Sequence, residues 1–320
     1  MDDSRVPVFP RESSDTYHPC MKKILAVMTI SASLMLAGCA SEPKNISDEG
    51  KIRVVTSFYP LYEIAKQVGG DLVTVTNLVP AGGEPHDYEP SPHDIIALHE
   101  AKLVIINGGG LEIWTDKIIP DLEKSGVQVL NESSSFQLLD GGEESPTDPH
   151  IWLDPIQYLA EVNAVAEKLS IIDPTHRSNF EDHAKTFAQH LTTLDQQYID
   201  GLKSCKFQSF VTNHAAFAYL AKRYHLEMIA IAGLSPDAEP SAKTMAELTN
   251  TIRKLSIKTI LVETLVSSKI AEVLAQEVGA TTLVMNPLEG LTNEDIGAGK
   301  SYITVMKENL ENLRTALECE

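Results

Sequence analysis

The chain has 320 residues, of which 43% are hydrophobic and 22% are charged, as is ordinary for a globular protein of about two domains. Its formal net charge of −19 argues against a nucleic acid as partner, because binding to phosphates requires a basic face. An acidic surface in contact with water is the ordinary interpretation of this charge. Attraction of cations toward a cleft is the more specific one.

The N-terminal region is typical of a secreted lipoprotein. Two lysines precede an apolar stretch over 24–36, which is too short to span a membrane as a stable helix and is typical of a secretory signal. The sequence Leu-Ala-Gly-Cys at 36–39 resembles the lipobox of bacterial lipoproteins, in which the cysteine carries the lipid. We therefore expect residues 21–38 to be a signal peptide and Cys39 to be the site of lipid attachment.

Residues 1–20 do not fit this signal, because they carry four acidic residues where a signal should be basic. Our hypothesis is that translation starts at Met21 and that residues 1–20 are a start-site artefact. Loss of residues 1–38 would remove four basic and four acidic residues, so the mature chain would keep its charge of −19. Residues 39–50 are polar and are expected to form a tether between the lipid and the folded part.

Short β-rich stretches alternate with helical patterns over residues 51–172 and again over 205–320. This alternation predicts two α/β lobes, each with a parallel sheet covered by helices. In the first lobe we expect strands over 52–56, 72–79, 103–106 and 127–130, and helices over 61–68, 92–100, 112–124 and 155–169. In the second lobe we expect strands over 207–212, 228–231, 259–262 and 282–285, and helices over 214–224, 241–255, 271–278 and 301–317.

A single long helix is expected over 174–202, within a linking segment at 173–204. Asp154-Pro155 and Asp173-Pro174 each indicate a helix start, with an N-cap aspartate followed by proline in the first turn. At about 1.5 Å per residue the long helix would measure roughly 40 Å. Two lobes joined in this way leave a cleft between them, which is where small ligands usually bind.

The chain has four cysteines and no CxxC pair, so neither a thiolate zinc finger nor a CxxC redox pair is expected. If Cys20 is not translated and Cys39 carries lipid, Cys205 and Cys319 remain. Outside the membrane, oxidising conditions allow a disulfide between these two residues, and two free thiols are the alternative.

Three histidines lie in loops at the ends of expected strands, namely His86, His150 and His214. In an open α/β sheet the loops at the carboxyl ends of the strands line the ligand crevice, so these side chains can converge across the cleft. Their spacing matches no local zinc motif, and a loop histidine taken alone is usually solvated. Two further histidines, His183 and His190, are expected to face solvent from the long helix.

Six stretches of the sequence together resemble one known family, the solute-binding proteins of zinc and manganese ABC transporters (bacterial solute-binding protein family 9). The matching stretches are 56–60 (Thr-Ser-Phe-Tyr-Pro), 84–90 (Glu-Pro-His-Asp-Tyr-Glu-Pro), 148–155 (Asp-Pro-His-Ile-Trp-Leu-Asp-Pro), 212–219, 233–241 and 286–289 (Asn-Pro-Leu-Glu). The resemblance covers Cys39 to about Leu317. It implies two α/β lobes bridged by a rigid helix, with a metal ion held between the lobes.

The resemblance further implies that His86, His150 and His214 bind the metal. Some zinc-binding members have an aspartate where Asn286 stands here, and a neutral amide is a poor replacement. Members with an Asn-Pro-Leu-Glu motif use its glutamate, so we assign the fourth ligand to Glu289. We expect Asn286 and Glu84 to support the ligands without binding the metal.

Three imidazoles and one carboxylate favour zinc, whereas the manganese-binding members have a carboxylate where His214 stands here. Four protein ligands close a tetrahedral shell and leave no position for an activated water, which favours carriage over catalysis. The sequence also contains no HExxH motif and no GxSxG motif, which argues against a hydrolase.

We therefore expect a monomeric protein, anchored through lipid to the extracytoplasmic face of a bacterial membrane, that captures Zn²⁺ and delivers it to the permease of an ABC transporter. The alternatives are a manganese- or iron-binding transporter component, a surface adhesin of the same family, and a zinc hydrolase. His214 argues against the first, and the absent catalytic motifs argue against the last. Nothing in the sequence marks an adhesive surface.

Overall fold

The computed structural model describes residues 50–142 and 145–320. These residues belong to one compact unit that spans residues 49–320. The expected start at Met21, the signal peptide and the lipid attachment at Cys39 lie outside the described residues. In the described part of the chain, no helix combines the length and the apolar character needed to cross a membrane.

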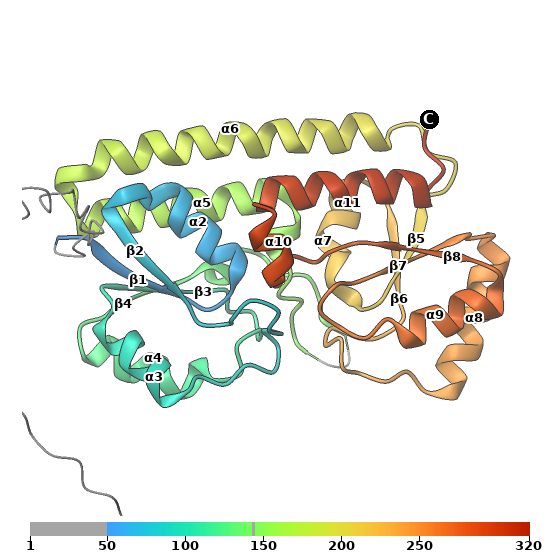
Figure 1. Ribbon diagram of the computed structural model, residues 1–320, viewed down its shortest axis with the longest axis horizontal. Coiled ribbons are helices and arrows are strands. Elements are labelled where there is room, and N and C mark those ends of the chain that lie inside the picture. Colours follow the sequence, from blue (N-terminus) through green and yellow to red (C-terminus); the bar gives the residue numbers. More distant parts are fainter. Residues whose placement is uncertain (1–49, 143–144) are drawn as a thin grey trace, which may run out of the picture. The chain divides into compact units, whose positions relative to one another are not determined.

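The first lobe contains a four-stranded parallel sheet in the order β2-β1-β3-β4 (Figure 1). Its strands are β1 (Ile52–Thr56), β2 (Val73–Asn77), β3 (Leu103–Ile106) and β4 (Gln128–Asn131), and its helices are α2 (Tyr59–Gly69), α3 (Pro92–Glu100), α4 (Thr115–Lys124) and α5 (Pro155–Ile172). Successive side chains of a strand point to opposite faces of the sheet. Val54 accordingly packs in the cluster that includes α2 and α5, and Val55 packs in the cluster that includes α3 and α4. Helices therefore cover both faces.

The second lobe repeats this arrangement, with a parallel sheet in the order β6-β5-β7-β8. Its strands are β5 (Ser209–Thr212), β6 (Glu227–Ala230), β7 (Thr259–Val262) and β8 (Thr281–Val284), and its helices are α7 (Ala218–Arg223), α8 (Ala242–Leu255), α9 (Lys269–Val278), α10 (Asn293–Gly297) and α11 (Tyr302–Ala316). Phe210 packs with α7 and α11, and Val211 packs with α8 and α9. The expected pair of parallel-sheet lobes is thus confirmed.

The long helix α6 (Arg177–Leu202) has 26 residues and is about 39 Å long. It begins after the 3₁₀ turn η4 (Pro174–His176), so the first residues of the expected helix form a tighter turn. The helix packs against α2 and α5 in the first lobe and against α11 in the second (Figure 1). It therefore supports both lobes along one continuous element.

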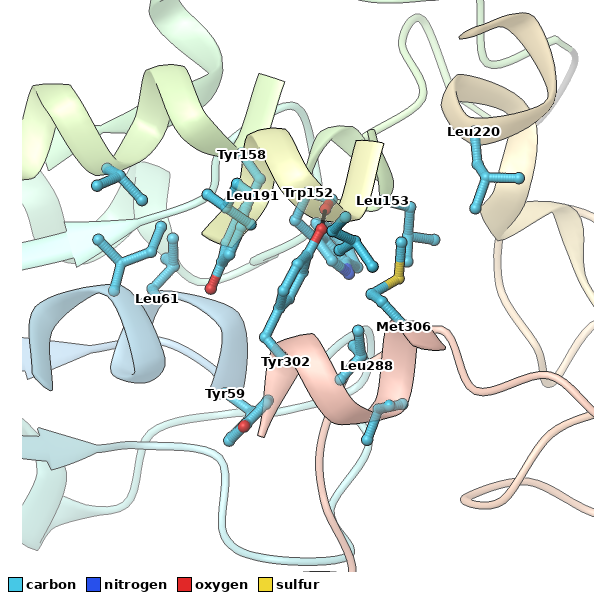
Figure 2. Close-up of a cluster of buried hydrophobic side chains, with 14 of the residues drawn as sticks. Tyr59, Leu61, Trp152, Leu153, Tyr158, Leu191, Leu220, Leu288, Tyr302 and Met306 are labelled. Atoms are coloured by element: carbon cyan, nitrogen blue, oxygen red, sulfur yellow. Dashed lines mark hydrogen bonds between the residues drawn. The ribbon is translucent and has the colours of Figure 1, made fainter. Parts of the chain in front are cut away.

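One of the hydrophobic core clusters runs from one lobe into the other. It includes Leu61 of α2, Leu191 of α6 and Leu220 of α7. Figure 2 shows Tyr302, from the start of α11, lying among residues of the first lobe. Its ring stacks on Tyr158 with centroids 3.9 Å apart, and its hydroxyl donates to the backbone oxygen of Trp152 at 2.6 Å. Because these contacts are buried and shared, the two lobes form one packed body.

The start of α4 differs from the expected helix over 112–124. Helix α4 begins only at Thr115, because the buried Glu112 turns back toward the end of β3. Its carboxylate accepts hydrogen bonds from the backbone N–H groups of Asn107 and Gly108 at 2.7 Å and 2.9 Å. Glu112 therefore provides hydrogen-bond acceptors for the backbone of the loop after β3 and does not extend the helix.

The helix expected over 214–224 is also shorter than predicted. It begins as the 3₁₀ turn η5 (Ala215–Phe217), and α7 follows. The N–H group of Ala215 donates to the carbonyl of Gly233 at 2.8 Å, which holds the start of the segment against a neighbouring loop. The short helix α10 was not predicted, although Thr292 and Asp295 form a capping box at its start.

A disulfide joins Cys205, which follows α6, to Cys319 near the C-terminus. The two cysteines are 114 residues apart in sequence, so the bond closes a loop that contains the sheet of the second lobe. A cross-link over a loop of this size stabilises the fold mainly by restricting the unfolded chain.

We predict that replacing both cysteines, Cys205→Ser with Cys319→Ser, lowers the free energy of unfolding by about 2–4 kcal/mol because the unfolded chain regains entropy. Differential scanning calorimetry with and without a thiol reductant measures this change as a lower melting temperature. The reductant should have no effect on the double variant, which serves as the control. An unchanged melting temperature of the reduced wild type would contradict the prediction.

Candidate metal centre

The candidate site lies where the carboxyl ends of the strands from both lobes meet. His86 is in the loop after β2, and His214 follows β5 by two residues. Glu289 is in the loop after β8, and His150 directly precedes the 3₁₀ turn η3 (Ile151–Leu153) that leads into α5. Open α/β sheets bind their ligands at this end of the strands, where neighbouring connections leave in opposite directions. Here two such edges face each other.

Four side chains converge at this place. The Oε1 atom of Glu289 lies 3.1 Å from Nε2 of His214, 3.2 Å from Nε2 of His150 and 3.3 Å from Nε2 of His86. The Nε2 atoms of His150 and His214 are 3.4 Å apart. One donor atom from each of the four residues can be chosen so that all lie within 4.8 Å of one another.

These separations fit a tetrahedral metal ion. Zinc binds imidazole nitrogen and carboxylate oxygen at about 2.0–2.2 Å, so two ligands of a tetrahedral ion are about 3.3–3.5 Å apart. The separations of 3.1–3.3 Å from Glu289 Oε1 to the three Nε2 atoms, and of 3.4 Å between the Nε2 atoms of His150 and His214, are close to this value. The geometry therefore suits a closed four-coordinate shell, and the donor set of imidazoles with one carboxylate suits zinc.

Two carboxylates hold two of the histidine rings in place. Asp148 Oδ1 lies 2.8 Å from Nδ1 of His150 and also accepts the backbone N–H of that residue at 2.9 Å. Glu263 Oε1 lies 2.7 Å from Nδ1 of His214 and accepts its backbone N–H at 3.1 Å. Each carboxylate thus fixes both the loop and the ring, and it presents Nε2 toward Glu289. A carboxylate in this position also makes the imidazole a stronger metal ligand.

His86 is held in another way. Its backbone N–H donates to Glu84 Oε1 at 3.1 Å. The other oxygen of Glu84 is buried and has no hydrogen-bond partner among the described residues. Burial and the nearby Glu289 raise the pKa of Glu84 to about 8. Glu84 therefore lies beside the four-residue cluster and contacts the backbone of His86.

The pKa values of the site residues follow from these contacts. Burial alone would raise the pKa of Glu289, but the three histidines hold that pKa well below its ordinary value. Burial lowers the pKa of His150 and of His214, but their hydrogen-bonded carboxylates outweigh it and raise both pKa values. Burial dominates for His86 and lowers its pKa. The contacts therefore favour the ionised form of Glu289 and the protonated forms of His150 and His214 relative to the same groups in water.

The loop that carries Glu289 has an unusual backbone. Leu288 is fully buried and adopts a positive φ of 60°, which costs a residue with a side chain about 1–2 kcal/mol. Its N–H donates to Asn286 Oδ1 at 2.7 Å. The side chain of Asn309 in turn bonds both the N–H and the carbonyl of Asn286, at 2.8 Å and 2.7 Å. Asn286 therefore shapes the turn that directs Glu289 into the cluster, and its own amide does not belong to the four donors.

The site opens to solvent on the side of His86. The side chain of His86 is 11% exposed, whereas those of the other three donors are 0–1% exposed. A cavity of about 240 Å³ lies at this opening, and Leu234 of the second lobe lines it together with His86. Asp87 and Asp237 come from opposite lobes here, and their hydrogen bond raises the pKa of Asp237. The entrance to the site is therefore acidic and lies between the lobes.

The structure brings together the four side chains that the sequence analysis named as ligands. Sequence reasoning missed the roles of Asp148 and Glu263. Asp148 stands two residues before His150, within the same motif, and Glu263 directly follows the strand β7. The available signals were therefore a carboxylate next to a candidate ligand and a carboxylate at the end of a strand. The expectation for His183 was wrong, because its Nδ1 lies 2.9 Å from the carbonyl of Val68 and its ring is half-buried.

Two facing α/β lobes with three histidines and one glutamate buried between them define a two-lobed protein with a candidate closed metal centre. Residues 54–316 match the family described as ZnuA, zinc-uptake complex component A, periplasmic. The chain belongs to this family. The expected family of metal-transporter solute-binding proteins is thus confirmed.

Several zinc-binding proteins are similar to this chain over most of its length. The zinc-binding lipoprotein AdcA of Streptococcus pneumoniae is 39% identical over 313 residues, which cover 94% of this chain and 62% of AdcA. The chain thus spans less than two-thirds of that relative. The high-affinity zinc uptake system protein ZnuA of Bacillus subtilis is 38% identical over 317 residues, which cover 92% of this chain and 98% of the relative.

Solved structures show the same fold. The Zn(II)-bound ZnuA-like domain of Streptococcus pneumoniae AdcA is 42% identical, with a TM-score of 0.76, and the match covers 84% of this chain and all of that domain. The laminin-binding protein Lmb of Streptococcus agalactiae, described as a bifunctional protein with adhesin and metal transporting activity, is 34% identical with a TM-score of 0.77. That match covers 83% of this chain and 99% of Lmb.

If the four donors hold zinc, Asp148→Asn and Glu263→Gln should each weaken zinc binding by about 10–100-fold, because each removes the charge that orients a ring while keeping the shape of the side chain. Competition with a fluorescent zinc chelator measures the affinity. The control is Glu247→Gln on the exposed face of α8, where the carboxylate pairs with the exposed Lys243. Zinc affinities of all three variants equal to that of the wild type would show that these carboxylates do not tune the site.

Proposed function

We propose that this chain captures Zn²⁺ outside the cell membrane and delivers it to the permease of an ABC transporter. The observation that carries this proposal is the convergence of three Nε2 atoms on one carboxylate oxygen of Glu289, at separations suited to a tetrahedral ion. Zn²⁺ is the cargo in this proposal and not a resident cofactor. Three imidazoles with one carboxylate favour zinc over manganese, which prefers sites rich in oxygen.

The arrangement supports carriage and not catalysis. A catalytic zinc site keeps one position for water or substrate, whereas four protein donors fill a tetrahedral shell. The three least exposed donors are essentially inaccessible to solvent, so no substrate reaches the ion from their side. Family membership agrees with this reading, because the family is described as a periplasmic component of zinc uptake.

The partner and the location rest on the family and on the N-terminal sequence. The relatives are described as zinc-binding lipoproteins or as part of a zinc uptake system, and an uptake system requires a permease. The lipobox-like sequence that ends at Cys39 supports a lipid anchor on the extracytoplasmic face of the membrane. A single chain supplies all four donors, so a monomer is sufficient to hold the ion.

The proposal predicts one tightly bound zinc ion per mature chain, which native mass spectrometry counts directly. His150→Ala and Glu289→Gln should weaken zinc binding by more than the roughly 10–100-fold expected for residues that only orient a ligand, because each alters a proposed ligand itself. His190→Ala is the matched control, since His190 lies exposed on α6. Isothermal titration calorimetry compares the three variants.

Equal losses of affinity in His150→Ala and His190→Ala would overturn the assignment of the site. A purified mature chain that retains manganese and excludes zinc would overturn the choice of metal. Asn286→Ala should weaken binding less than Glu289→Gln, because Asn286 shapes the loop and contributes no donor atom to the cluster.

Zinc binding should weaken as the pH falls. Although burial opposes it, neighbouring carboxylates raise the pKa values of His150 and His214, so both rings hold protons at pH values where an ordinary histidine has lost them. A ligating imidazole must be neutral, so zinc has to displace these protons. Affinity is therefore greatest above the raised pKa values and is lost progressively below them.

Calorimetry in buffers of different ionisation enthalpy counts the protons released, and we expect roughly one or two per zinc ion. Full retention of zinc at about pH 4, well below the ordinary histidine pKa, would contradict a site of three imidazoles.

A further inference from the structure

Tyr219 joins the two loops that carry His150 and His214. It lies on α7, five residues after His214, and is only 2% exposed. Its hydroxyl donates a hydrogen bond to the backbone oxygen of Asp148 at 2.8 Å and accepts one from the backbone N–H of Leu139 at 2.9 Å. One side chain of the second lobe thus bonds to two backbone groups of the first.

The two backbone partners of Tyr219, Asp148 and Leu139, are also bonded to each other. The N–H of Asp148 donates to the carbonyl of Leu139 at 2.9 Å, so these two residues are already bonded to each other. Tyr219 adds two further hydrogen bonds and fixes the pair against α7. Hydrogen bonds to Tyr219 and Leu139 therefore fix the backbone of Asp148, while its carboxylate holds the ring and the N–H of His150.

The other end of the connection is equally fixed. Between His214 and Tyr219 the chain forms η5, in which Ala216 and Phe217 are fully buried. The N–H of Ala215 bonds to the carbonyl of Gly233. None of the residues from His214 to Tyr219 is exposed, so this segment is packed along its whole length. We therefore expect a displacement of one loop to move the other.

The hydroxyl must keep its proton to make both bonds. Burial raises the pKa of Tyr219 to about 12, so the group is protonated across the physiological range and can donate to one oxygen while it accepts from one N–H. Removal of the hydroxyl would leave the carbonyl of Asp148 without this partner in a site that is 2% exposed. A buried polar group without a partner is costly, so the pair would move to find another one.

We propose that Tyr219 is a positioning residue of the metal site. Its hydroxyl fixes the loop of His150 to α7, the helix that follows His214. This connection keeps the two donors at a fixed distance across the lobes and slows the release of zinc. The inference rests on the proposed function, since it assumes that the four donors hold zinc. Tyr219 contacts no donor atom itself and acts through Asp148.

The test compares Tyr219→Phe with Tyr198→Phe in the full mature chain. Tyr198 is a matched control because it is fully buried and its hydroxyl donates to the backbone oxygen of Met306 at 2.7 Å, which joins α6 to α11, away from the loops that carry the four donors. Both variants lose a buried hydroxyl, and both should lower the melting temperature. Only Tyr219→Phe should change the metal site.

Zinc release is measured by stopped-flow mixing with a fluorescent chelator, and Co²⁺ loaded in place of zinc reports the ligand geometry through its visible absorption. We expect Tyr219→Phe to release zinc about tenfold faster than the wild type, because both hydrogen bonds of the hydroxyl are lost and the loop of His150 is less firmly held, and to alter the Co²⁺ bands. Tyr198→Phe should match the wild type in both measurements.

Release rates and Co²⁺ spectra that are the same in Tyr219→Phe, Tyr198→Phe and the wild type would overturn the positioning role and leave the proposed function intact. Equal changes in both variants would also overturn it, since they would reflect a general loss of stability. A wild-type chain that retains no zinc would overturn the proposed function, and this inference with it.

Discussion

The rest of the site depends on one demand: three imidazole nitrogens and one carboxylate oxygen must lie within contact distance in a place that water does not reach. Glu289 Oε1 lies 3.1–3.3 Å from three Nε2 atoms, and three of the four donors are almost fully buried. Buried charges and polar groups are costly unless each is paired. Glu289, Asp148 and Glu263 raise the pKa values of the histidine rings that they contact, and a divalent cation bound by those rings would have to displace their protons. The carboxylates behind the rings are therefore part of the same electrostatic balance as the donors.

The shared core holds the four donors at these distances. Trp152 shows the connection, because its ring lies 5.2 Å from that of His150 and its indole N–H donates to the carbonyl of Pro287, in the turn that leads to Glu289. The backbone oxygen of Trp152 accepts from Tyr302 at the start of α11. Side chains that pack the core thus also set the distance between donors from opposite lobes. A close-packed interior resists gradual deformation, so the lobes and α6 keep the site nearly preformed.

The loop from Asn286 to Glu289 shows how the identity of a donor depends on backbone shape. Asn286 is not among the four donors, and its amide oxygen instead accepts the N–H of Leu288 and builds a turn. The turn forces Leu288 to a positive φ, and Asn309 holds it from α11. The carboxylate that reaches the cluster therefore lies three residues further along the chain. Local strain is accepted at a functional loop when surrounding hydrogen bonds define it completely.

The sequence by itself determined the fold class, the two lobes and the long helix, because alternation of short apolar strands with amphipathic helices depends on local periodicity. Motifs around His86, His150, His214 and Glu289 also singled out those residues, through their resemblance to a family. The sequence did not reveal Glu263 or Tyr219 as partners of the ligand loops, nor the positions where α4 and α7 begin. Glu263 is 49 residues from His214 and Tyr219 is 71 from Asp148, so no local pattern relates them. Only the packing of the two lobes against a shared core, with the carboxyl ends of their strands toward each other, decides which distant side chains share a hydrogen bond.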